Sequence, residues 1–104
     1  MKKLVIEEGK KPSYYPNYQL RTENENILPL AETSVKPEGG EAFLVHFNSQ
    51  KGYRDIAKGL SLEQADKLAR GLLKDIANIL ISVNPQLTLE DKSAELAISQ
   101  SSPQ

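Results

Sequence analysis

Basic and aromatic side chains are concentrated in one segment, residues 9–22, which contains no acidic residue. This combination suits single-stranded nucleic acid, because bases stack on aromatic rings for roughly 1–3 kcal/mol each while cations follow the phosphates. Further basic and aromatic residues occur between residues 51 and 58. The sequence therefore predicts a nucleic-acid-binding surface, called here the aromatic–basic surface, made of Lys10, Lys11, Tyr14, Tyr15, Tyr18, Arg21, Lys51, Tyr53, Arg54 and Lys58.

A structural interpretation of the same segment stays open. Tyrosine is amphipathic and often covers the edge of a hydrophobic core while its hydroxyl reaches a polar partner. The pair Lys10 and Lys11 is equally compatible with a solvated turn.

The other polar residues show no catalytic or metal-binding pattern. His46 is the single histidine, and no serine lies in a nucleophile motif, so we expect His46 at a partly buried strand position. Glu7 and Glu8 would point to opposite faces of a strand and could not share a site. The absence of cysteine excludes disulfides and thiolate chemistry. We therefore expect no enzymatic activity, no cofactor and no metal.

The composition limits the size and location of the protein. The 104 residues suffice for one small domain, and the formal net charge of −1 excludes a chain that wraps nucleic acid as a polycation. The longest strongly apolar run, Ile76–Val83, is much shorter than the ~20 residues of a membrane span. The apolar run Leu4–Ile6 is too short for a secretory signal. We therefore expect a cytoplasmic protein with no membrane partner.

One long helix is predicted over residues 62–83. Ser61 and Gln64 have the spacing of a capping box, which marks a helix start. Apolar residues then recur at steps of three and four as far as Val83, and Asn84–Pro85 ends the pattern. The last third of this helix is apolar around most of its circumference, which indicates burial on more than one side.

Strand-forming segments precede the helix. They alternate in polarity, are rich in β-branched and aromatic residues, and are separated by turn-forming residues. The predicted strands lie within Leu4–Ile6, Tyr14–Thr22, Ile27–Thr33, Glu41–Phe47 and Tyr53–Lys58, with a turn at Lys36–Gly40. Strands followed by a helix indicate an α+β fold, here an antiparallel meander of four to five strands with one long helix packed on the sheet.

The chain end is predicted to be separate from this domain. Residues 1–86 are expected to form a single α+β domain, and residues 87–98 a short helical extension with Thr88 as its cap. Residues 99–104 contain no apolar anchor and are predicted to be a disordered tail.

The apolar residues outnumber what one helix can cover. The predicted hairpin carries Phe43, Val45 and Phe47 on one face and Leu44 and Ile56 on the other. Because large exposed apolar patches are rare on monomers, we predict a homodimer with a self-complementary interface made of Ile76, Ile79, Leu80, Ile81 and Val83. Alternatively, the apolar residues of the chain end, Leu87, Leu89, Leu96 and Ile98, cover the helix end within one chain.

The passage Lys58–Leu62, Lys-Gly-Leu-Ser-Leu, resembles the junction of the last strand and the helix in the positive-cofactor-four transcriptional coactivators. The similarity extends over Tyr53–Leu80, and the Pur-alpha and Whirly proteins are similar in build. In that family four antiparallel strands precede one helix, the helix contributes to a dimer, and the sheet binds single-stranded DNA. The resemblance implies that Lys58 lies near DNA.

Two functions are therefore compatible with the sequence. The first is a non-enzymatic, dimeric single-stranded nucleic-acid-binding protein, which accounts for the acid-free segment. The alternative is a small protein–protein interaction module, such as an adaptor, assembly factor or inhibitor, that docks through an apolar sheet face. The near-neutral net charge favours the interaction module.

Overall fold

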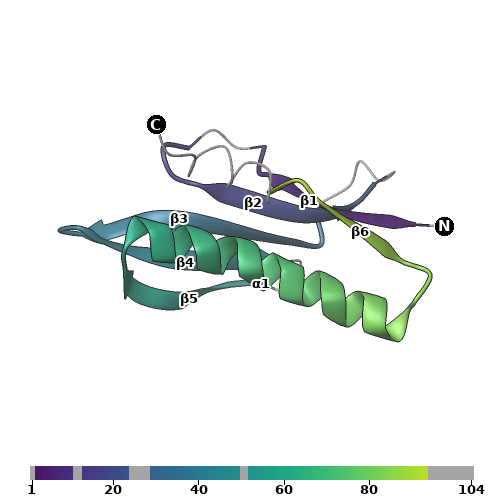
Figure 1. Ribbon diagram of the computed structural model, residues 1–104. Helices are drawn as coiled ribbons and strands as arrows, with labels where there is room; N and C mark the ends of the chain where they lie inside the picture. The colour runs from purple at the N-terminus through teal and green to yellow at the C-terminus, as the bar shows by residue number, and fades with distance from the viewer. Residues whose placement is uncertain (1, 11–12, 24–28, 50–51, 94–104) are drawn as a thin grey trace.

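A computed structural model shows one six-stranded sheet with a long helix packed on it (Figure 1). The structure describes residues 2–10, 13–23, 29–49 and 52–93. The strands are β1 (Lys3–Glu8), β2 (Asn17–Thr22), β3 (Ala31–Gly39), β4 (Ala42–Ser49), β5 (Gly52–Leu60) and β6 (Thr88–Asp91), and the helix is α1 (Leu62–Val83). The predicted α+β class is confirmed, and the strand count is one higher than the upper prediction.

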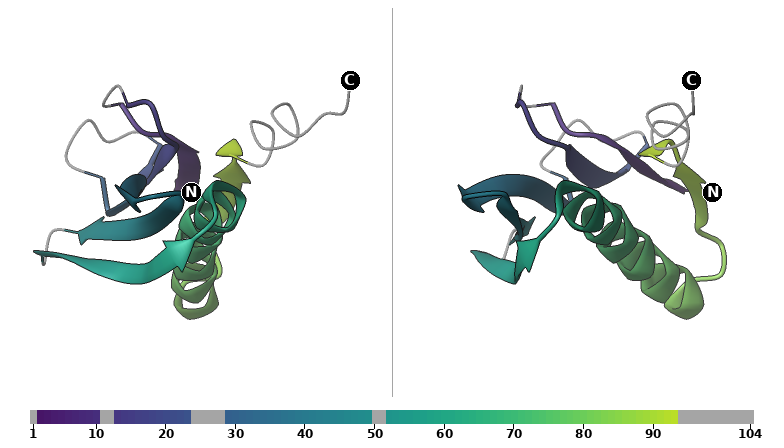
Figure 2. Two further views of the ribbon diagram at one scale, coloured as in Figure 1. Left: turned by 90° about the vertical axis from the view of Figure 1, so that its left-hand side faces the viewer. Right: turned by 60° about the vertical axis from the view of Figure 1, so that its left-hand side comes forward.

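The first five strands form an antiparallel meander. Each strand pairs with the one that follows it, and β6 then returns to the free edge of β1, so the sheet order is β5-β4-β3-β2-β1-β6. The helix α1 covers one face of this curved sheet (Figure 2). We call the opposite side the open face.

The prediction of a helical extension after residue 86 is wrong at residues 88–91. These residues form β6, which pairs in parallel with β1 and joins the domain. The amide of Lys92 donates to the carbonyl of Ile6 at 2.8 Å, and Leu87 and Leu89 pack against the core. Alternation of these leucines with exposed Thr88 suits a strand with one buried face. Residues 94–98 of the predicted extension and the whole predicted tail lie outside the described residues.

The third strand is shifted along the chain from its predicted place. It begins at Ala31 and continues through most of the predicted turn to Gly39. Pro37 lies at a register shift in the pairing with β4, where its missing amide donor is tolerated. The chain reverses only after Gly39, whose φ of 127° favours glycine.

The predicted helix is confirmed at both ends. The amide of Gln64 donates to the Ser61 hydroxyl at 3.1 Å, and the amide of Ser61 donates to the Gln64 side chain at 2.9 Å. These two bonds complete the capping box. The last helical residue is Val83, and the amide of Asn84 donates back to the carbonyl of Leu80 at 3.0 Å.

Small side chains bring the helix close to the sheet. The fully buried helix residues are Ala65, Ala69, Leu73 and Ala77, which follow one another at steps of four. Opposite them, the buried Thr33 hydroxyl donates to the carbonyl of Ala69 at 3.0 Å. The core is completed from the strands by Leu4, Ile6, Tyr18, Leu20, Ala31, Val35 and Val45.

Candidate functional site

Tyr18 belongs to the core rather than to the exposed aromatic–basic surface. Its side chain is 3% exposed, and its hydroxyl donates to the carboxylate of Asp66 on α1. Burial, together with this hydrogen bond, raises the pKa of Tyr18 above its ordinary value. The ring therefore cannot stack on a base, which corrects its predicted role.

Tyr15 and Tyr14 have different environments although they are adjacent. The ring of Tyr15 packs edge-on against Phe43, with centroids 5.2 Å apart, and covers the edge of the core. The Tyr14 side chain is fully exposed. Of the three predicted tyrosines in this segment, only Tyr14 is fully exposed to a stacking partner.

Arg21 is held by an acid from another strand. Its guanidinium contacts the Glu7 carboxylate at two points, Nε to Oε2 at 2.5 Å and Nη2 to Oε1 at 3.1 Å. The hydrogen bond from Arg21 lowers the pKa of Glu7, and the same bond raises the pKa of Arg21. The charge of Arg21 is thus neutralised by Glu7, and Arg21 is not available to a phosphate.

Three further cations of the aromatic–basic surface are described, and all three are exposed. Lys10 precedes β2, whereas Arg54 and Lys58 lie on β5 at the other end of the meander. Lys11, Lys51 and the side chain of Tyr53 lie outside the described residues. The structure therefore does not join the seven described residues of this surface into one basic and aromatic platform.

The five predicted interface residues divide into two groups. Ile76, Leu80 and Ile81 pack against the core of their own chain. Ile79 and Val83 are 63% and 76% exposed. The alternative prediction is that residues of the chain end cover the helix end. Two of its four residues, Leu87 and Leu89, pack against the core. The other two, Leu96 and Ile98, lie outside the described residues.

The open face of the sheet is polar at its centre, which differs from the predicted apolar face. Leu44 is half-buried, and Ile56 is exposed where the pairing of β4 with β5 shifts register. His46 takes the expected partly buried strand position, and its Nδ1 lies 3.1 Å from the carboxylate of Asp55 on β5. Docking through an apolar open face is therefore poorly supported.

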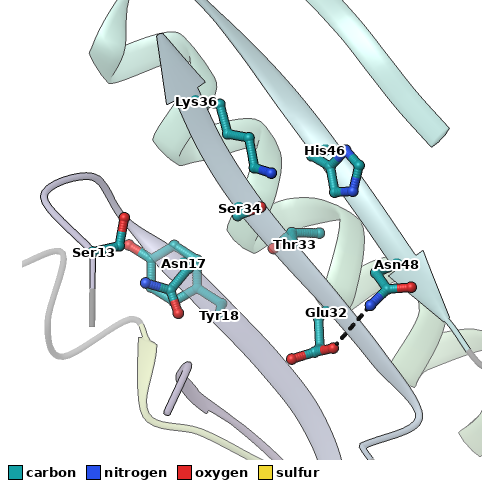
Figure 3. Close-up of a pocket in the computed structure, with 9 residues that line it drawn as sticks. All are labelled: Ser13, Asn17, Tyr18, Glu32, Thr33, Ser34, Lys36, His46 and Asn48. Atoms are coloured by element: carbon teal, nitrogen blue, oxygen red, sulfur yellow. Dashed lines mark hydrogen bonds between the residues drawn. The ribbon is translucent and has the colours of Figure 1, made fainter. Parts of the chain in front are cut away.

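A polar pocket of about 280 Å³ lies on this open face and was not predicted from the sequence (Figure 3). Strand β3 supplies Glu32, Ser34 and Lys36 at alternate positions, so their side chains share one face. The remaining lining residues are Ser13, Asn17, Tyr18, Thr33, His46 and Asn48. Strand register alone brings these residues together: Ser34 is opposite both Asn17 and His46, and Glu32 is opposite Asn48.

The wall formed by Asn17 depends on a close backbone approach. The amide of Gly9 donates to the carbonyl of Asn17 at 2.9 Å. A Cβ atom at Gly9 would lie 1.9 Å from the Asn17 side-chain oxygen, so any other residue would displace that side chain. Because Gly9 has no side chain, the side-chain amide of Asn17 can lie at the rim of the pocket.

Comparisons with protein-family models, with curated proteins and with solved structures found no match. Within the described ranges, no group of three or more His, Cys, Asp or Glu residues is placed to hold a metal ion. No described helix is long and apolar enough to cross a membrane. The function is therefore inferred from the geometry of the chain.

Proposed function

We propose that this protein is a non-enzymatic interaction module that forms a homodimer through the C-terminal half of α1. The observation that carries the proposal is the exposure of Ile79 and Val83, 63% and 76%, one turn apart on the helix. In Figure 1 this half of α1 extends past β4 and β5, so these strands do not cover it.

The two exposed residues continue a longer apolar row. Leu72, Ile76, Ile79 and Val83 follow at steps of four, three and four, which places them on one side of the helix; we call this row the helix stripe. Leu72 and Ile76 are half-buried, so the stripe runs without a break from the core to the surface. This spacing is the one by which two helices pair along an apolar seam.

The same part of the helix is suited to pairing with itself. Residues 76–83 contain no charged side chain, so two copies can meet without like-charge repulsion. A two-fold contact then buries the exposed isoleucine and valine of both copies in one patch. Burial of each contributes about 1–2 kcal/mol before the cost of association, and the half-buried residues of the helix stripe add to this contact.

The first prediction is that Ile79→Glu abolishes the dimer without unfolding the chain. Sedimentation equilibrium at micromolar concentration should give twice 11.5 kDa for the wild type and 11.5 kDa for the variant. The matched control is Asn78→Glu, which adds the same charge at an exposed neighbouring position and should remain dimeric. Substitution of Ile81 is unsuitable because that side chain packs on the core. A wild type that stays at 11.5 kDa at 100-fold higher concentration would contradict the proposal.

Nucleic-acid binding stays a prediction, now carried by the full exposure of Tyr14, which follows the exposed Lys10 by four positions in the sequence. If Tyr14 stacks on single strands, Tyr14→Ala should weaken the binding of oligothymidine several-fold in fluorescence anisotropy at low salt. Tyr15→Ala is not a usable probe, because it removes a core contact. Absence of wild-type binding at tens of micromolar protein would exclude this function, because even non-specific affinities are about 10⁻⁴–10⁻⁶ M.

A further inference from the structure

The pocket on the open face contains one cation and one anion without an ionic partner among the described residues. Elsewhere in the described part, several charged side chains form ion pairs. These are Arg21 with Glu7, Lys3 with Glu23 and Glu90, and Arg70 with Asp66. No such pair is found there for Lys36 or Glu32, and the Glu32 carboxylate accepts a hydrogen bond from the neutral Asn48 amide at 3.2 Å.

These two charges lie at opposite ends of the pocket. Glu32 and Lys36 are four residues apart on β3, which corresponds to about 13 Å between their backbones. Figure 3 shows the hydroxyl side chain of Ser34 between them. The pocket therefore has a positive end and a negative end with no net charge.

The side walls are built from residues whose side chains can hydrogen-bond. Asn17 borders the pocket from β2, and His46 and Asn48 border it from β4 (Figure 3). The contact of His46 with Asp55 orients its imidazole on this face. Most ligand pockets are lined by apolar groups, so a lining of amides, hydroxyls and separated charges favours a hydrophilic ligand.

We propose that this pocket binds the zwitterion of a short peptide of about two residues. The ligand's carboxylate meets Lys36, its ammonium group meets Glu32, and its peptide group lies between the side chains of Asn17, Ser34 and Asn48. Both charges of such a ligand are satisfied, whereas a simple anion would be repelled at the Glu32 end. The volume of about 280 Å³ is suited to a ligand of this size.

The test uses the full chain and alanylalanine, followed by amide chemical shifts in two-dimensional NMR. Saturable shifts are expected at Ser34, His46 and Asn48. N-acetyl-alanylalanine lacks the ammonium group and alanylalanine amide lacks the carboxylate, and each should bind about 10-fold more weakly or worse, because a charge-assisted contact is lost.

Variants assign each charge to its end of the pocket. Lys36→Met should weaken alanylalanine binding about 10-fold but should scarcely change the binding of alanylalanine amide, which has no carboxylate. Glu32→Gln should also weaken alanylalanine binding about 10-fold but should scarcely change the binding of N-acetyl-alanylalanine, which has no ammonium group. The exposed helix residues Lys67 and Glu63 supply matched controls, Lys67→Met and Glu63→Gln, which should bind like the wild type. An unchanged thermal midpoint shows that a variant is folded.

Three results would overturn this proposal. The first is the absence of shifts at tens of millimolar dipeptide. The second is binding of the N-acetyl or amide derivative as tight as that of the zwitterion. The third is equal weakening by Lys36→Met and by its control on the helix.

Discussion

Arg21 and Glu7 connect β2 to β1 by a two-point ion pair whose side chains are largely shielded from water. Gln19 donates to the same carboxylate at 2.7 Å, so three side chains of neighbouring strands form one network. Because Arg21 holds the pKa of Glu7 below its ordinary value of 4.5, the folded protein favours the charged carboxylate. The pair therefore stabilises the fold only while Glu7 is ionised.

The direction of the pH effect follows from this lowered pKa. The stabilisation is complete above the unfolded-state pKa of Glu7 and is lost as the pH falls through the lower folded-state value. We expect the free energy of unfolding of the wild type to decrease on acidification below about pH 4.5. Glu7→Gln should lower stability at pH 7 by about 1–2 kcal/mol and make the acid-side decrease shallower.

Urea unfolding at a series of pH values measures this prediction. The control is Glu8→Gln, because the Glu8 side chain is exposed on the other face of β1 and the Arg21 pair stays intact. Equal pH slopes for the wild type and Glu7→Gln would show that the pair does not contribute to stability.

At the scale of elements, β6 is short, with only four residues, but it is part of the sheet. It lies along β1 and gives that strand a second neighbour, while Leu87 and Leu89 cover the core near the end of α1. The segment after the helix is therefore an integral strand of the domain.

Leu89→Ala tests this integration of β6. Removing a partly buried leucine should destabilise the protein by about 1–2 kcal/mol in urea unfolding, less than the 2–5 kcal/mol of a fully buried site. Thr88→Ala, at the exposed neighbouring position, should change stability by less than about 0.5 kcal/mol. If the two variants are equally stable, β6 does not pack on the core in solution.

For the whole molecule, the two proposed binding surfaces lie on opposite sides of the sheet. The helix stripe belongs to α1, whereas the pocket opens on the face that α1 leaves uncovered (Figure 3). A dimer formed through the helix would leave both pockets exposed. The Ile79→Glu monomer should therefore bind alanylalanine as the wild type does. The dimer proposal and the dipeptide proposal can thus fail independently of each other.

The sequence by itself determines α1 almost completely. Ser61 and Gln64 start the helix, the apolar row defines its buried side, and Asn84–Pro85 stops it. All these signals act between residues at most four positions apart, so they do not depend on the rest of the fold. The strands β1, β2, β4 and β5 overlap their predicted segments for a similar reason, because alternation is a property of each segment alone.

The tertiary structure decides which polar and aromatic residues are accessible. Tyr18 shares the parity of Leu20. Its contact with Asp66 of α1 and the contact of Arg21 with Glu7 each join residues at a distance in sequence that no local pattern records. The assignment of residues 88–91 to a strand also depends on the free edge of β1.

The pocket also depends on the tertiary structure. Lys36 and Glu32 can be seen in the sequence as residues four positions apart. Their meeting with Asn17, His46 and Asn48 requires the register of three strands, including the shift of β3 at Pro37. A one-residue change of register would turn these side chains to the opposite face, so only the assembled sheet creates the site.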